Sequence, residues 1–344
     1  MNNFEKILNQ NELSKNDIIF LLNITDNEKE KLLLKKADEV REKFVGNQIH
    51  FRGVIEFSNY CSQHCLYCGL REDNFALQRY RMSTEEIIET AKIIYSNGIK
   101  TIVLQSGEDS FFDTDLISYL IYSIKKQFDV AITLSIGERN FDEYRAWKIA
   151  GADRYLMKHE TANKKLYYAI HSKASLEDRI NHLKYLKNLG YQVGTGNMIG
   201  LPGQKIEDIA NDILICKELD VDMAAFGPFI PSPFTPFQSR KAGSVDLTLK
   251  TMAVARLVLK DVNIPATTAL DSIDNTGREK GLSAGANVVM PNFTPKPYRE
   301  NYQIYSNKRG ITDDPIGSYQ KIRNRVLETG REISSSYGER HAAR

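Results

Sequence analysis

The pattern of hydrophobic and polar positions changes at about residue 50. From there on, short apolar and β-branched runs alternate with longer amphipathic segments, which predicts strands separated by helices. The strands are expected near residues 51–57, 100–106, 130–136, 153–158, 191–199, 222–228, 263–268 and 287–290.

The segments between these runs carry helix signals. Ser83 and Glu86 predict a capping box at the start of STEEIIETAKIIYSNG, and Gly98 is placed to end that helix. LEDRINHLKYLKNLG, IEDIANDILICKEL and LTLKTMAVARLVL repeat the pattern. Eight strands, each followed by a helix or loop, predict an α/β fold, a (β/α)8 TIM-type barrel. The alternative is a doubly wound sheet, which needs a glycine-rich turn where this chain has FSNYC.

The two ends of the chain flank this barrel. Residues 1–48 are expected to form an N-terminal helical extension, residues 49–305 the barrel, and residues 306–344 a C-terminal extension. NYQIYSNKRGITDDP is expected to loop across an opening, and the final SSSYGERHAAR to fray.

Composition narrows the class of protein. The chain has 344 residues, of which 42% are hydrophobic and 26% charged, and its formal net charge is +2. Basic and acidic residues are interspersed, so no footprint for nucleic acid or a membrane surface is expected, and a small-molecule or protein partner is favoured. No apolar stretch reaches the roughly 18 residues of a membrane span, and the start of the chain is polar, so a cytoplasmic protein is expected.

The four cysteines are distributed unevenly, which argues against a disulfide framework. Cys216 stands alone on the apolar face of DIANDILICKELD and is expected to be a core residue. Cys61, Cys65 and Cys68 lie together in CSQHCLYC, just past a predicted strand. Three thiolates suit an iron–sulfur cluster with one open iron, whereas structural zinc needs four ligands. There are two alternatives: a zinc site that recruits His64 as its fourth ligand, and three unrelated buried cysteines.

This C-x3-C-x2-C loop, with an aromatic residue (Tyr67) before the last cysteine, resembles the cluster loop of the radical S-adenosylmethionine (SAM) superfamily. The resemblance implies one 4Fe-4S cluster on Cys61, Cys65 and Cys68. It also implies that the open iron chelates SAM, which is cleaved reductively to methionine and a 5'-deoxyadenosyl radical.

Polar residues at the ends of the next strands support this resemblance. Gln105, Gly107 and Glu108 in VLQSGED are similar to the family's segment that contacts the methionyl amino group, although a turn with a helix N-cap explains them too. Ser135 and Glu138 follow the third strand, and the fourth is followed by His159, Glu160 and Thr161, for which helix capping is the alternative.

Two further segments are assigned to SAM. Glu160 and Arg179 together can pair with the amino and carboxylate groups of a bound amino acid, and an ordinary surface ion pair is the alternative. NMIGLPGQ resembles the family's adenine-contacting segment, with Met198 and Leu201 as contacts. Gly200 and Gly203 allow close backbone approach there, and a plain glycine turn is compatible with that role.

Longer phrases resemble one subgroup, the FeFe-hydrogenase maturases HydE. They include CLYCGLR, RYRMS, GADRYLMKHETAN, MIGLPGQ, GPFIPSP, NIPATTAL and GANVVMPNFTP, from about residue 30 to 305. The resemblance implies a role in assembly of the hydrogenase H-cluster, by radical attack on sulfur of an iron-bound cysteine in an organometallic precursor. It also implies transient partners among the other maturases, a reductant such as ferredoxin or flavodoxin, and a substrate cavity lined by Arg52, Thr133, Thr267, Thr268, Met290, Tyr302 and Tyr305.

The chain departs from the subgroup in two ways. No cysteine follows Cys216, so no auxiliary cluster is expected, and Lys158 stands where a close relative is expected to have arginine. Rival functions are a lysine mutase resembling methylornithine synthase, a sulfur-inserting enzyme resembling biotin synthase, and a non-enzymatic iron–sulfur scaffold. The second needs further cysteines, and the third leaves the SAM-like segments unexplained.

Overall fold

The computed structural model describes residues 3–172 and 174–340. Its centre is a parallel sheet with the strand order β2-β3-β4-β5-β6-β7. These strands are β2 (Gly53–Ser58), β3 (Thr101–Ser106), β4 (Ala131–Ser135), β5 (Arg154–Leu156), β6 (Gln192–Ile199) and β7 (Met223–Pro228). All of them fall where the apolar runs predicted strands, and each pairs with the strand next to it in sequence.

The two edges of this sheet are linked by shorter pairings. A small sheet of order β8-β1-β9 contains β1 (Gln48–Phe51), β8 (Val288–Val289) and β9 (Glu332–Ile333). Parallel bridges join Met223 to Asn263 and Pro265 to Val288, and β8 pairs with β1, which leads directly into β2. The expected barrel architecture is therefore present, with regular pairing over six strands and reduced pairing over the rest of the ring.

The prediction of a regular strand at 263–268 is wrong. Only isolated bridges occur there, because Pro265 has no N–H to donate to a neighbouring strand. Thr267 already serves as the N-cap of α11 (Thr268–Ile273). Of the strand predicted at 287–290, only β8 (Val288–Val289) forms a strand.

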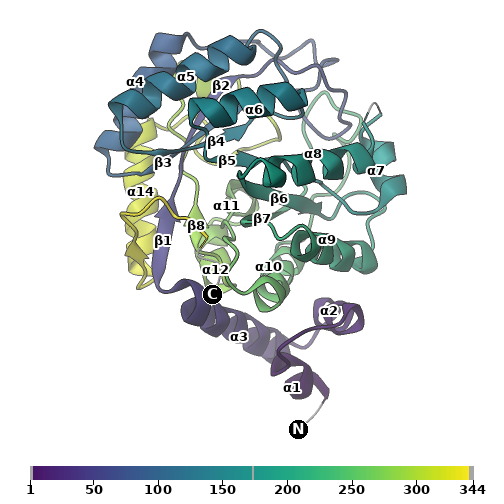
Figure 1. Cartoon of the computed structure of the whole chain (residues 1–344). Coiled ribbons are helices and arrows are strands. Elements are labelled where there is room, and N and C mark those ends of the chain that lie inside the picture. The colour runs from purple at the N-terminus through teal and green to yellow at the C-terminus, as the bar shows by residue number, and fades with distance from the viewer. Residues whose placement is uncertain (1–2, 173, 341–344) are drawn as a thin grey trace.

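Helices cover the outside of the sheet (Figure 1). They are α4 (Thr84–Ser96), α5 (Thr114–Gln127), α6 (Phe141–Ala150), α7 (Lys164–Ile170), α8 (Leu176–Asn188), α9 (Ile206–Glu218) and α10 (Val245–Leu259). The predicted capping box of α4 is confirmed, since Ser83 N donates to Glu86 Oε2 at 2.8 Å and Ser83 Oγ accepts from Glu86 N. The remaining helices on the C-terminal side are α12 (Gly277–Ser283), α13 (Lys296–Arg299) and α14 (Pro315–Glu328).

The N-terminal residues form helices, as expected: α1 (Asn3–Leu8), α2 (Lys15–Leu22) and α3 (Asn27–Val45). They lie below the sheet, where α2 and α3 pack against α9 and α10 (Figure 1). Cys216 of α9 is fully buried in this core, as predicted. The domain boundaries at 48 and 305 remain a prediction. No helix among the described residues combines the length and apolarity that crossing a bilayer requires.

The end of the described chain is ordered rather than frayed. Tyr337 O accepts from Thr101 Oγ1 at 2.7 Å and from an Arg154 guanidinium nitrogen at 2.9 Å. Arg340 pairs with Asp261 at 3.1 Å. The prediction of fraying is therefore wrong for residues 334–340, because their main-chain carbonyls satisfy buried polar groups at the amino end of the sheet. Residues 341–344 lie outside the described residues.

Candidate active site

A cavity of ≈ 860 Å³ opens at the carboxyl ends of the strands. Each strand of the main sheet contributes at least one lining residue at or near its end, including Glu56, Gln105, Ser135, Leu156, Met198 and Pro228. This is the face on which barrel enzymes carry their chemistry. Its volume lies within the range of sites that enclose a cofactor or substrate.

The cysteine loop follows β2 and is fixed by backbone hydrogen bonds. Ser62 N donates to Glu108 O at 3.1 Å, and Leu66 N donates to Ile170 O at 3.0 Å. Gly107 lies so close to the loop that a Cβ on it would be 2.7 Å from Cys61 Cβ. Cys68 lines the cavity, which places the loop at its wall.

The chemistry of the three thiols fits an iron–sulfur cluster. Burial raises the pKa of Cys68 to about 12, with the neighbouring Cys61 as the next cause. Burial also raises the pKa of Cys65 well above its usual range, and Cys68 and Cys61 add to that shift. Buried thiols whose pKa values are raised by burial and by one another need a positive centre to be held as thiolates, and cluster iron supplies one.

The alternative of a zinc site with His64 is not supported. His64 Nδ1 lies 2.7 Å from Asp73 Oδ2, and Nε2 lies 2.9 Å from Glu72 Oε2. Among the described residues, no group of three or more His, Cys, Asp or Glu side chains is arranged to hold a single metal ion. A cluster is larger than one ion, so its thiolates lie farther apart than the ligands of a zinc site.

His171, which no sequence pattern indicated, contacts the cysteine loop. Its Nδ1 lies 3.1 Å from Cys65 Sγ, and its Nε2 lies 3.2 Å from Tyr67 OH. The side chain is buried, and burial lowers the pKa of His171 to about 3. The histidine follows α7, far from the cysteines in sequence, so only the fold brings the two together.

The residues assigned to SAM gather at the cavity. Tyr67, Gln105, Ser135, Glu160, Arg179 and Met198 all line it. Glu160 has a backbone φ of 59°, in the left-handed region that non-glycine residues rarely adopt, and its Oε2 is buried with no hydrogen-bond partner among the described residues. An unsatisfied carboxylate oxygen at the cavity is the group expected to receive an ammonium.

Arg179 and Glu108, two of the charged residues assigned to SAM, already have partners within the protein. Arg179 Nε lies 2.5 Å from Glu138 Oε1, so Arg179 forms an ion pair with Glu138, and its contact with the carboxylate of a bound amino acid stays a prediction. Glu108 does not line the cavity, since its Oε2 accepts from Gln63 Nε2 at 2.6 Å and its Oε1 from Glu138 N at 3.0 Å. Its carboxylate braces the cysteine loop and does not face the cavity freely.

The adenine-like segment forms a turn fixed by its own glutamine. Gln204 Oε1 accepts from Gly200 N at 2.7 Å, and its Nε2 donates to Met198 O at 2.8 Å. Gly200 has a φ of 87°, which a larger residue would adopt only with strain. Leu201 is buried in a small apolar cluster against which Tyr67 and Met198 pack, so these residues lie together.

The predicted substrate residues divide into two groups. Thr267, Thr268, Met290, Tyr302 and Tyr305 line the cavity, and their contact with substrate stays a prediction. Arg52 and Thr133 do not line it, and this part of the prediction is wrong: they line a separate small cavity among the sheet residues. Arg52 lies at the amino end of β2, where an Arg52 guanidinium nitrogen donates to Gly338 O at 3.1 Å.

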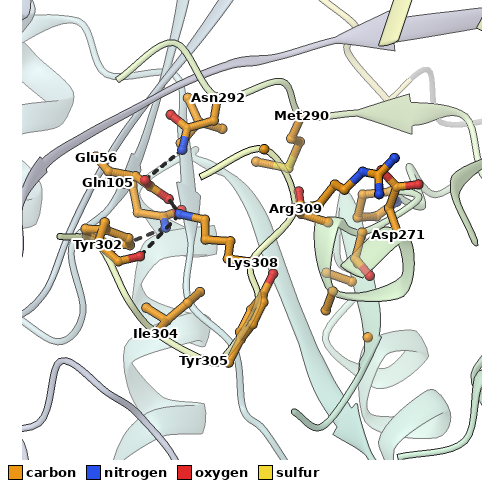
Figure 2. Close-up of a pocket in the computed structure, with 18 of the residues that line it drawn as sticks. Glu56, Gln105, Asp271, Met290, Asn292, Tyr302, Ile304, Tyr305, Lys308 and Arg309 are labelled. Atoms are coloured by element: carbon orange, nitrogen blue, oxygen red, sulfur yellow. Dashed lines mark hydrogen bonds and ion pairs between the residues drawn. The ribbon is translucent and has the colours of Figure 1, made fainter. Parts of the chain in front are cut away.

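A buried polar network that the sequence did not predict crosses the cavity wall (Figure 2). Lys308 donates to Glu56 Oε1, and Asn292 Nδ2 donates to Glu56 Oε2 at 2.7 Å. Gln105 Nε2 donates to Tyr302 OH at 3.3 Å, and this hydrogen bond links β3 to the C-terminal segment. Residues 304–313 of that segment line the cavity almost continuously, so the segment expected to loop across an opening lies at the cavity.

Comparisons with known proteins agree with this site. The family model described as "Radical SAM superfamily" matches residues 55–215. The chain is 47% identical to the "[FeFe] hydrogenase maturase subunit HydE" of Thermotoga maritima, across 97% of this chain and 95% of the relative. It is 31% identical to the 3-methylornithine synthase of Methanosarcina acetivorans, across 83% of this chain and 81% of that relative.

Solved structures show the same fold. The crystal structure of methylornithine synthase (PylB) superposes with a TM-score of 0.85 at 27% identity and covers 96% of this chain and 97% of its own. The FeFe-hydrogenase maturase HydG from Carboxydothermus hydrogenoformans reaches a TM-score of 0.82 at 21% identity, covering 96% of this chain and 79% of its own. The HydG likeness shows the fold alone.

The geometry and the comparisons converge on one class of enzyme. The cysteine loop, its thiols and the cavity beside it fit a 4Fe-4S cluster and SAM, which are the cofactors of radical SAM enzymes. Similarity to HydE extends over nearly the whole chain, beyond the part that the superfamily shares. The chain belongs to the HydE family of radical SAM enzymes.

Proposed function

We propose that this enzyme acts in assembly of the FeFe-hydrogenase H-cluster, on a small organometallic precursor that carries iron-bound cysteine. The observation that carries the proposal is the 47% identity to the Thermotoga maritima maturase subunit, which covers the cysteine loop and the cavity residues alike. The full sequence has four cysteines, with none after Cys216, so one cluster is expected.

Radical formation is assigned to the half of the cavity next to the cysteine loop. When bound there, the cluster and SAM supply a 5'-deoxyadenosyl radical. Glu160, with its unsatisfied Oε2, accepts a hydrogen bond from the methionyl ammonium, and Arg179 is held by Glu138 to face the carboxylate. Met198, Leu201 and Tyr67 provide the apolar surface for adenine.

Substrate binding is assigned to the other half of the cavity. The hydroxyl groups of Thr267 and Thr268 can donate to a carboxylate or a cyanide nitrogen. Met290 and Tyr305 give that end an apolar wall, which excludes water and limits the hydrogens open to abstraction. With SAM bound beside it, this half of the cavity would hold the precursor with its cysteine sulfur, rather than a C–H bond, toward the adenosyl group.

The same proposal implies partners and a location. The precursor arrives from another hydrogenase maturase and the product passes to a further one, through transient contacts. The electron for SAM cleavage comes from a low-potential carrier such as ferredoxin or flavodoxin. The partner maturases and the electron carrier are both expected in the cytoplasm, which is the location that we propose. The sequence carries no apolar run that suggests another location.

Lysine mutase activity, the isomerisation of free lysine, is the second candidate function. It is supported by the 31% identity to 3-methylornithine synthase and by the TM-score of 0.85 with PylB. The 47% identity to HydE favours the maturase role.

One experiment separates the two functions. The reconstituted enzyme is added anaerobically, with SAM and dithionite, to a hydrogenase maturation mixture that lacks only HydE, and hydrogen production is measured. Restored hydrogenase activity that Cys65→Ala abolishes is the expected result. In parallel, the enzyme is incubated with lysine and the products are analysed by mass spectrometry. Conversion of lysine to methylornithine, with no restored hydrogenase activity, would contradict the maturase role.

A further inference from the structure

We propose that His171 is a positioning residue for the cluster, which donates a hydrogen bond to the Cys65 thiolate and raises the reduction potential of the cluster. His171 Nδ1 lies 3.1 Å from Cys65 Sγ, within the distance of an N–H···S hydrogen bond. His171 does not line the cavity, so it acts through Cys65 and not on SAM or substrate.

The protonation of the ring follows from the partners. A thiolate that binds iron has no proton to give, so His171 Nδ1 must carry the hydrogen between them. Tyr67 OH lies 3.2 Å from Nε2 on the other side of the ring. In the neutral ring Nε2 is an acceptor, and Tyr67 then donates to it. The result is a directed chain of hydrogen bonds from Tyr67 through His171 to Cys65.

Packing fixes the ring in this orientation. The side chain of His171 is 5% exposed, so water does not compete for its nitrogens. Tyr167 stacks on the ring, with centroids 4.6 Å apart and an interplanar angle of 29°, while Tyr67 meets it edge-on at 5.4 Å. The helix and the cysteine loop are also joined directly, because Leu66 N donates to Ile170 O at 3.0 Å.

The hydrogen bond has a predictable effect on electron transfer. Reduction adds negative charge to the cluster, and part of that charge lies on its sulfur ligands. A donor aimed at one of those sulfurs stabilises the reduced state and makes the cluster easier to reduce. Cys61 Sγ, by comparison, accepts from a backbone amide, Glu108 N, at 3.4 Å. The side-chain donor thus distinguishes Cys65.

A matched set of variants tests the proposal without any substrate. His171→Leu removes the donor, whereas His171→Asn keeps an N–H near the position of Nδ1. Tyr67→Phe keeps the histidine and removes only the hydroxyl. The clusters are reconstituted, their iron and sulfide contents are measured, and midpoint potentials are determined by redox titration followed by electron paramagnetic resonance (EPR), in the absence of SAM.

We expect a more negative potential in His171→Leu, a smaller shift in the same direction in Tyr67→Phe, and recovery toward the wild-type value in His171→Asn. His182→Leu, on the outer helix α8, is the control and should leave the potential unchanged. A fully loaded His171→Leu cluster with the wild-type potential would overturn the proposal. If His171→Leu loses its cluster, the test rests on Tyr67→Phe. A midpoint potential of the Tyr67→Phe cluster equal to the wild-type value would then overturn the proposal. These outcomes do not depend on the hydrogenase role.

Discussion

Lys308 and Glu56 form an ion pair inside the wall of the cavity. Their side chains are 6% and 4% exposed, and they join the C-terminal segment to the first strand of the main sheet. Asn292 supports the same carboxylate, and the Lys308 ammonium lies 4.8 Å from the centre of the Tyr302 ring (Figure 2). The pair therefore holds the segment that lines the cavity mouth.

Removing one partner of this pair should destabilise the protein. Lys308→Met leaves the Glu56 carboxylate buried without a cation, which costs about 3–5 kcal/mol for a pair of this kind. Chemical denaturation of the cluster-free protein measures the loss. The double variant Glu56→Gln, Lys308→Met is the control and should recover most of it. A single variant with wild-type stability would show that the pair does not fix the segment.

SAM affinity should depend on pH through Glu160. Burial raises the pKa of this carboxyl group, with Lys158 and Arg179 opposing the shift. A protonated carboxyl cannot pair with the methionyl ammonium, so affinity should fall as pH decreases through that raised pKa, toward about tenfold per pH unit. Calorimetric titration at a series of pH values measures the effect. Glu160→Gln should bind SAM more weakly and with a flatter profile; an identical pH profile in this variant would argue against the role of Glu160.

Gly107→Ala should impair cluster assembly. A Cβ at this position would lie 2.2 Å from Tyr60 O and 2.7 Å from Cys61 Cβ, and neither backbone nor cysteine can move without disturbing the loop. The expected result is a lower iron content after reconstitution. Gly317→Ala is the control, because its Cβ meets only the Asp314 side chain at 3.3 Å. Full iron loading of Gly107→Ala would contradict the close packing of loop and strand.

Asp212→Asn should weaken SAM binding, although Asp212 is not expected to touch SAM. This buried carboxylate of α9 accepts hydrogen bonds from Ala162 N and from Asn197 Nδ2. Ala162 follows Glu160 closely in the chain, and Asn197 forms a parallel β-bridge with Glu160, so Asp212 supports the backbone around Glu160. Loss of hydrogen bonds to a charged group costs about 1.5–3 kcal/mol and loosens both segments. Asp153→Asn, at the other end of the sheet, is the control. Equal dissociation constants for SAM in the two variants would exclude this positioning role.

The sequence pattern was sufficient for most of the fold. Apolar periodicity located the six strands of the main sheet because each has a buried run, and the Ser83 capping box marked its helix correctly. It failed at 263–268, where apolar and β-branched residues suggest a strand but Pro265 limits pairing. Likewise, periodicity cannot show that residues 334–340 satisfy buried arginines, since that depends on tertiary contacts.

The candidate site was only partly predictable from the sequence. The cysteine trio was located by its spacing, and the polar residues at strand ends were expected at one face because a parallel barrel brings the carboxyl ends of its strands together. Arg52 was misplaced because its role was carried over from the resemblance, although its place at the start of the predicted strand 51–57 puts it at the amino end, away from the cavity at the carboxyl ends. His171 and Lys308 were missed, since each reaches its partner from a distant segment through packing that no local motif records.

The central claim is that Cys61, Cys65 and Cys68 hold a cluster whose open iron takes SAM from the adjoining cavity. The most direct measurement is the EPR spectrum of the anaerobically reconstituted, reduced enzyme with and without SAM, together with the amount of 5'-deoxyadenosine formed. The account predicts a cluster signal that changes when SAM is added and a nucleoside product, both abolished by Cys65→Ala. An unchanged spectrum with no 5'-deoxyadenosine would contradict it.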